Sequence, residues 1–228
     1  MGAPSPFEDM KTIVAISQWV QAEGYRYAYQ AGRRRKWHRS LMASWTMNEP
    51  WPNAAHGCVV DYYGLPKHAF YTVRQSMQML DVSLSYSDIH AVPNEQLRAT
   101  VWVDSELDTA KQLCTVQVMY FTPAGEELGT ERITAGDVDN DAADDYDDDG
   151  YGFGFVVPAA KAIKLRQLAY KPPARLQGDV VIVRLSLLCV ETGSASAVQL
   201  ATNDYTFGIG TVTSTAATCQ RVHDRHGI

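Results

Sequence analysis

Hydrophobic positions in the first part of the chain recur at helical spacing. Between residues 10 and 28 they lie three or four residues apart, which is typical of one face of an α-helix. The preceding Ser5-Pro6-Phe7-Glu8 has the form of a capping box with proline at the first helical position. Gly32 suits the end of a helix because glycine accepts a left-handed backbone. The pattern therefore predicts a long helix from this capping box to about Ala31.

A short, nearly uncharged segment follows, with a period of two. Its alternating positions are Leu41, Ala43, Trp45 and Met47, and the low charge is typical of a buried strand. The chain must then turn within residues 48–53, because each of two prolines lacks an N–H donor and restricts the residue before it.

A second helix is expected from about Pro66. Ala69, Phe70, Val73 and Met77 would share one of its faces. The order helix, strand, loop, helix is typical of an α/β fold, which we predict for residues 1–80.

Beyond Leu80 the helical period gives way to short alternating segments bounded by turn residues. They lie near residues 97–103, 114–120, 128–133, 151–155, 181–187, 198–200 and 205–209. About eight short strands without a helix between them predict an all-β, immunoglobulin-like antiparallel sandwich over residues 81–213. Residues 214–228 would then form a C-terminal tail.

The composition is that of a globular protein. The chain has 228 residues, of which 46% are hydrophobic and 20% charged. No apolar run approaches the roughly 20 residues that span a bilayer, so we expect no membrane partner. The net charge of −6 arises from eight Asp within residues 137–149, and without them it would be positive. This local acidity argues against a nucleic-acid partner.

The acidic stretch contains a candidate cation site. Asp145, Asp147, Asp149 and Gly150 resemble the opening of a calcium loop, in which alternating carboxylates surround a hard cation. Position twelve of that loop is Val156 instead of Glu, so an EF-hand is excluded. Weak calcium binding and a solvated acidic loop both remain open, and no cofactor is otherwise required.

The four cysteines lie far apart in the chain. A chain of this length does not need disulfides to fold, so the spacing indicates neither a disulfide framework nor a CxxC metal site. Cys114 and Cys189 are interpreted as small core residues.

Two motifs carry a family resemblance. Residues 44–53 read Ser-Trp-Thr-Met-Asn-Glu-Pro-Trp-Pro-Asn, and residues 60–71 read Val-Asp-Tyr-Tyr-Gly-Leu-Pro-Lys-His-Ala-Phe-Tyr. Together with residues 17–26 and 33–35 they resemble glycoside hydrolase family 2, in particular β-mannosidases and exo-β-glucosaminidases. The resemblance implies a (β/α)8 barrel flanked by β-sandwiches. Residues 1–80 would be the last helix, strand and helix of that barrel.

The resemblance also implies where the chemistry lies. In that family the acid/base and nucleophile glutamates belong to earlier barrel strands, and retaining hydrolysis needs both, roughly 5–5.5 Å apart. We therefore expect a C-terminal fragment of an exo-glycosidase for terminal β-mannosides or related sugars, inactive by itself. Glu49 after Asn48 imitates the acid/base motif, but the residues that follow match the eighth strand instead.

Four residues are candidates for substrate binding. The resemblance places Trp45 in the terminal-sugar subsite, with Asn48 and Glu49 at the carboxyl end of the strand and Trp51 at the mouth. An indole can cover the C–H-rich face of a sugar. The alternatives are a core role for Trp45 and packing against the second helix for Trp51.

A second class of function stays open. The chain would then be a non-catalytic module in which the β-sandwich and the barrel remnant bind or scaffold carbohydrate. In either class carbohydrate is the expected partner, and the incomplete barrel is expected to promote homo-oligomers because its strand lacks neighbours.

Overall fold

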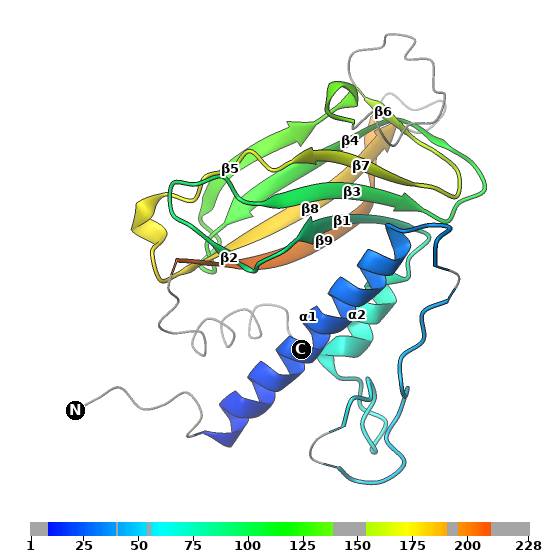
Figure 1. The fold of residues 1–228 in the computed structure, drawn as a ribbon, viewed down its shortest axis with the longest axis vertical. Helices are drawn as coiled ribbons and strands as arrows, with labels where there is room; N and C mark the ends of the chain where they lie inside the picture. Colours follow the sequence, from blue (N-terminus) through cyan, green and yellow to red (C-terminus); the bar gives the residue numbers. More distant parts are fainter. Residues whose placement is uncertain (1–8, 40, 54–55, 139–153, 191–195, 211–228) are drawn as a thin grey trace. The chain divides into compact units, whose positions relative to one another are not determined.

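The computed structural model describes residues 9–39, 41–53, 56–138, 154–190 and 196–210. The chain divides into two units, one of Met1–Gln78 with Ser214–Ile228 and one of Met79–Thr213. Most regular structure in the described ranges is β-sheet, with two α-helices, both in the first unit (Figure 1).

The first helix, α1, spans Met10–Arg33. Its N-cap is Asp9, whose carboxylate accepts hydrogen bonds from the backbone N–H groups of Lys11 (3.3 Å) and Thr12 (3.2 Å). The long helix is confirmed, and within the described residues it begins at Met10 with Asp9 as its N-cap. The residues of the expected capping box, Ser5 to Glu8, lie outside the described residues.

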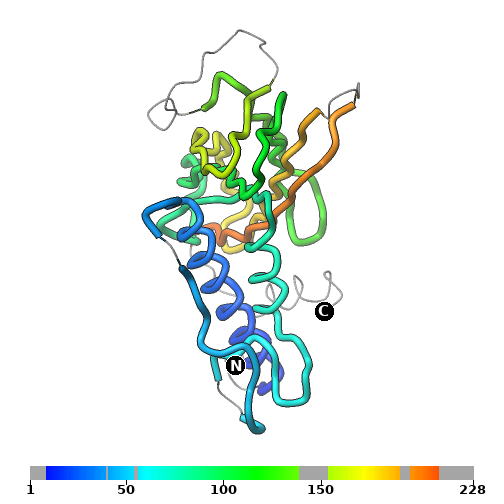
Figure 2. Tube along the Cα trace, turned by 90° about the vertical axis from the view of Figure 1, so that its right-hand side faces the viewer, coloured from blue at the N-terminus to red at the C-terminus, as the bar shows by residue number. Residues whose placement is uncertain are grey.

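The second helix, α2, spans His68–Ser76 and lies beside α1 (Figure 2). A small buried core lies between the two helices. It contains Ala22 of α1, Val59 of the connecting loop and Ala69 of α2. Arg33 at the end of α1 donates from Nη1 to the carbonyl oxygens of Ser76 (2.7 Å) and Gln78 (2.6 Å). These bonds satisfy free carbonyl groups at the end of α2.

The strand predicted for residues 41–47 is absent. Only isolated bridges occur nearby, between Asn48 and Val60 and between Val60 and Pro66. Leu41, Trp45 and Met47 are 84%, 85% and 63% exposed, so the expectation of a buried strand is wrong for this chain. A strand forms only where a neighbouring strand accepts its backbone hydrogen bonds, and no described strand pairs with residues 41–47. The described part of the first unit is therefore helix, loop, helix rather than an α/β layer.

The second unit contains two sheets (Figure 1). The three-stranded sheet has the order β1-β3-β7, with β1 at Leu80–Tyr86, β3 at Ala99–Ser105 and β7 at Ala162–Gln167. The six-stranded sheet has the order β2-β9-β8-β4-β5, with β6 paired to β4. Its strands are β2 (His90–Ala91), β4 (Lys111–Phe121), β5 (Glu127–Ile133), β6 (Phe155–Val157), β8 (Val180–Val190) and β9 (Ala197–Ile209). All pairings are antiparallel except that of β2 with β9.

The two sheets of the second unit share one hydrophobic core. Alternate residues of β4 and β8 are buried in it, as the period of two predicts. The Leu84 N–H of β1 donates to the Tyr205 hydroxyl of β9 (3.0 Å), which ties the sheets together. The predicted all-β second half is confirmed. The strands β1, β2 and β7 were not predicted, and the two strands expected at 198–200 and 205–209 are one strand, β9.

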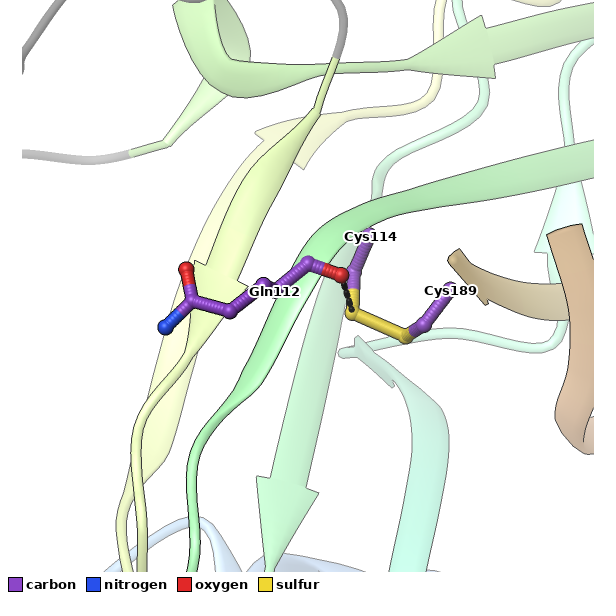
Figure 3. The surroundings of a disulfide bond; sticks show 3 residues. All are labelled: Gln112, Cys114 and Cys189. Atoms are coloured by element: carbon purple, nitrogen blue, oxygen red, sulfur yellow. Dashed lines mark hydrogen bonds between the residues drawn. A yellow bond between two sulfur atoms is a disulfide. The ribbon is translucent and has the colours of Figure 1, made fainter. Parts of the chain in front are cut away.

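A disulfide joins β4 to β8 (Figure 3). Its cysteines, Cys114 and Cys189, face each other in the register of the two strands and are buried. Their interpretation as small core residues is confirmed, but the expectation that the cysteines form no disulfide is wrong. They are 75 residues apart in sequence, and only the pairing of β4 with β8 brings the two side chains together.

Candidate functional site

The candidate site is built on the loop between α1 and α2. The Val60 N–H donates to the Met47 carbonyl (2.9 Å), and the Glu49 N–H donates to the Val60 carbonyl (3.2 Å). The Lys67 N–H donates to the Val59 carbonyl (2.9 Å). Three short segments of the family-like motifs are thereby held side by side, although no sheet forms.

Helix α1 fixes one side of this loop. The Gln21 amide (2.8 Å) and the Tyr25 hydroxyl (2.9 Å) both donate to the Gly57 carbonyl. Burial, and then the nearby Tyr29 and Cys58, raise the pKa of Tyr25 above its usual value, so the phenol stays protonated and remains a donor.

Cys58 links two further parts of the loop. This buried, free cysteine contacts His56 Nδ1 (2.8 Å) and Thr46 Oγ1 (2.9 Å) through its sulfur. The contacts connect residue 46 to residue 58, so the position of the Trp45 segment depends on packing around a thiol.

The central polar contact of the site is an ion pair between Glu49 and Lys67. Glu49 is only 4% exposed, and its Oε1 accepts a hydrogen bond from Lys67 Nζ. Lys67 Nζ also lies 3.5 Å from the His56 carbonyl oxygen. A buried carboxylate without a counter-charge is costly, so Lys67 makes the burial of Glu49 possible.

A tight turn lies next to this pair. The Asp61 N–H donates to the Leu65 carbonyl (2.9 Å), and the Leu65 N–H donates to Asp61 Oδ1 (2.8 Å). Gly64 has a φ of +83°, a conformation that favours glycine. At the tip of the turn, Tyr62 and Tyr63 make an edge-to-face contact with ring centroids 5.3 Å apart.

The turn and the proline-rich loop border an open hollow of about 340 Å³. Its lining includes two carboxylates and two aromatic rings. Its lining residues are Glu49, Pro52, Asn53, Asp61, Tyr62 and Tyr63.

Of the four predicted substrate-binding residues, only Glu49 lines this hollow. Asn48 is exposed and takes part in the bridge to Val60. Trp45 and Trp51 are exposed, so the alternative that Trp45 is a core residue is wrong for this chain. Substrate binding by all four stays a prediction.

Sequence reasoning missed the roles of Asp61, Tyr63 and Lys67. They belong to the Asp-Tyr-Tyr-Gly-Leu-Pro-Lys motif that carries the resemblance, so the motif was a usable signal. The pairing of Lys67 with Glu49 depends on the loop closing across 18 residues.

The predicted calcium ligands Asp145, Asp147 and Asp149 lie outside the described residues, and calcium binding stays a prediction. In the described ranges, His, Cys, Asp and Glu side chains form no group of three or more that could hold a metal ion. Neither α1 nor α2, the helices of the described ranges, is both long and apolar enough to cross a membrane.

The β unit contains its own polar cluster. Arg166 of β7 pairs with Glu131 of β5 (2.8 Å) and with Asp137 (2.9 Å). The Tyr120 hydroxyl of β4 donates to Glu131, and burial followed by this hydrogen bond raises the Tyr120 pKa far above its usual value. Because each charge has a partner, we interpret the cluster as a connection between the two sheets.

Comparisons with known proteins support the predicted resemblance. No protein-family model matches the chain. The chain is similar to β-mannosidase B from Aspergillus terreus, with 30% identity over 139 residues, which is 57% of this chain and 16% of that protein. It is also similar to β-mannosidase B from Aspergillus clavatus, with 33% identity over 123 residues, 50% of this chain and 14% of that protein.

The resemblance to glycoside hydrolase family 2 β-mannosidases is confirmed. Solved structures agree at the level of the fold. The β-D-mannosidase from Dictyoglomus thermophilum has a TM-score of 0.57 at 17% identity, over 88% of this chain and 20% of that chain. An exo-chitosanase from Amycolatopsis orientalis has a TM-score of 0.54 at 17% identity, over 83% of this chain and 18% of that chain. This chain thus spans about a sixth of the length of the curated β-mannosidases it matches.

Proposed function

We propose that this chain is the C-terminal part of a family 2 exo-glycosidase that hydrolyses terminal β-mannosides or related β-linked sugars. Residues 1–80 would contribute the end of the catalytic barrel, and residues 81–213 would form the immunoglobulin-like β-sandwich that follows it in the sequence. The main support for this proposal is the 30% identity to a β-mannosidase over 139 residues, which make up only 16% of that protein.

The environment of Glu49 favours a role in holding the site together over a role as the acid/base. A general acid/base must reach the glycosidic oxygen and exchange a proton with it. Glu49 is buried and its Oε1 is paired with Lys67, an arrangement that holds the loop in place. The catalytic glutamates would accordingly come from parts of the enzyme outside this chain.

The exposure of residues 41–47 also supports the proposal. Leu41, Trp45 and Met47 present apolar surface to solvent, although their alternation is that of a strand. A row of large apolar side chains is costly in water and is typical of a surface that another segment covers. The earlier strands of a longer glycosidase would supply that segment.

A chimera tests the proposal directly. This chain replaces the segment that it matches in the Aspergillus terreus β-mannosidase B, and turnover of an aryl β-mannoside is measured. We expect activity in the chimera and none in the 228-residue chain alone, because both catalytic carboxylates are needed. A folded but inactive chimera, beside an active unaltered enzyme, would contradict the proposal, as would turnover by the chain alone that Glu49→Gln removes.

Trp45 is tested in the same chimera. Trp45→Ala should lower kcat/KM by several orders of magnitude, beyond what a parallel loss of folded protein explains, because its indole would support the sugar ring. Trp51→Ala is the comparison and should act mainly through stability. Normal kinetics of Trp45→Ala would remove it from the substrate-binding residues.

The alternative function is a non-catalytic carbohydrate-binding module. The hollow at Glu49 favours it, because it combines aromatic and acidic side chains within this chain. Sugar binding together with an inactive chimera would support this alternative.

A further inference from the structure

We propose that the hollow lined by Glu49, Asp61 and Tyr63 binds a single neutral pyranose ring, at a place that does not include Trp45. The proposal deepens the proposed function and rests on it for the choice of a β-mannoside as ligand. Four observations support it: the free carboxylate oxygens, the exposed tyrosine, the rigid turn and the size of the hollow.

The two carboxylates are arranged to accept hydroxyl groups. Glu49 uses Oε1 for Lys67, and Asp61 uses Oδ1 for the Leu65 N–H. In the described part of the chain, no residue donates to Glu49 Oε2 or Asp61 Oδ2. Each side chain is therefore held by one oxygen and keeps an acceptor for a ligand. Bonds from sugar hydroxyls to such charged acceptors are stronger than those between neutral groups.

The tyrosines supply an apolar surface. Tyr63 is 75% exposed, and its edge-to-face contact with Tyr62 restricts the orientation of the ring. An aromatic face covers the C–H groups of a sugar while the hydroxyls at the rim bond to carboxylates. Exposed aromatic rings beside acidic groups are thus suited to a sugar and less suited to a purely apolar ligand.

The turn is organised before any ligand binds. The reciprocal bonds between Asp61 and Leu65 and the left-handed Gly64 fix residues 61–65. A ligand that binds here orders few groups, so little of the interaction energy is lost to entropy.

The size and the charge of the hollow limit the choice of ligand further. A volume of about 340 Å³ is near the lower limit of small-molecule sites and gives room for one sugar ring. Lys67 balances Glu49, so Asp61 leaves the hollow with a net negative charge. A neutral sugar is accepted, whereas a uronic acid is repelled.

Saturation-transfer NMR on the 228-residue chain tests the proposal. The probe is methyl β-D-mannopyranoside, and the anionic comparison is D-glucuronic acid. We expect transfer to the mannoside with millimolar affinity and none to the uronic acid. Tyr63→Ala and Asp61→Asn should each weaken binding by about threefold to tenfold. Asp61→Asn keeps an oxygen for the Leu65 N–H, so the turn survives.

The matched control is Tyr71→Ala. It removes an exposed tyrosine of α2 outside the hollow and should leave binding unchanged. Far-UV circular dichroism checks that each variant is folded. Three results would each overturn the proposal. They are no mannoside binding by the unaltered chain, binding by Tyr63→Ala and Asp61→Asn that is as tight as that of the unaltered chain, and loss of binding only in Trp45→Ala. An active chimera with any of these results would leave the proposed function standing, so the two failures are distinguishable.

Discussion

Glu49 and Lys67 show how a single pair of residues determines the shape of the site. Glu49 sits just before a proline, and Lys67 is the N-cap residue of α2. Their contact closes the loop that carries the hollow, so both the exposed motif and the start of α2 depend on it. Removing one partner leaves a buried charge, which is worse than removing both.

The first prediction concerns this pair. Lys67→Met should destabilise the first unit by about 3 kcal/mol, because Glu49 is left buried without a counter-charge. The double variant Glu49→Gln/Lys67→Met should recover part of that loss. Denaturant unfolding followed by tryptophan fluorescence measures it well, since Trp19, Trp37, Trp45 and Trp51 are four of the five tryptophans and all precede residue 79.

Lys11→Met, at an exposed lysine of α1, is the control and should change little. An unfolding midpoint of Lys67→Met equal to that of the unaltered chain would show that the pair does not hold the loop.

At the scale of elements, β4 and β8 carry the only covalent cross-link found in the described residues. The disulfide joins central strands of the larger sheet and closes a loop with a sequence separation of 75. Such a link restricts the unfolded chain more than the folded one. The stability of the second unit should therefore depend on the redox state.

The second prediction follows from this link. Reduction with dithiothreitol, or the double variant Cys114→Ala/Cys189→Ala, should lower the free energy of unfolding by about 2–5 kcal/mol. Dithiothreitol should have no further effect on the double variant, which serves as the control. Mass spectrometry that finds both cysteines alkylated without prior reduction would show that the bond does not form.

At the scale of the whole molecule, the important feature is apolar surface without a covering segment. Residues 41–47 have the alternation of a strand and the exposure of a loop. Unpaired, apolar, extended chain tends to pair with another copy. The predicted homo-oligomer therefore has a specific location.

The third prediction is concentration-dependent association through this segment. Light scattering after size exclusion should show dimers or larger species, and Leu41→Lys/Trp45→Ser should shift them toward the monomer, because the charge and the lost indole remove the apolar contact. Val198→Lys, at an exposed valine of β9, is the control and should leave association unchanged. A strict monomer at high concentration would contradict the prediction.

Much of the fold follows from the sequence alone. The helical period predicted α1 and α2, and the period of two predicted most of β3, β4, β5 and β8, because both periods arise from local backbone geometry. The family-like motifs predicted the resemblance that the comparisons confirm.

The tertiary structure decided what depends on distant partners. Residues 41–47 have a strand pattern but form no strand, since backbone hydrogen bonds need a neighbour that their own sequence does not supply. Cys114 meets Cys189 only through the register of β4 with β8. Glu49 is buried only because Lys67 returns to it across the loop. Periodicity is a property of consecutive residues, whereas pairing and burial are properties of the folded chain.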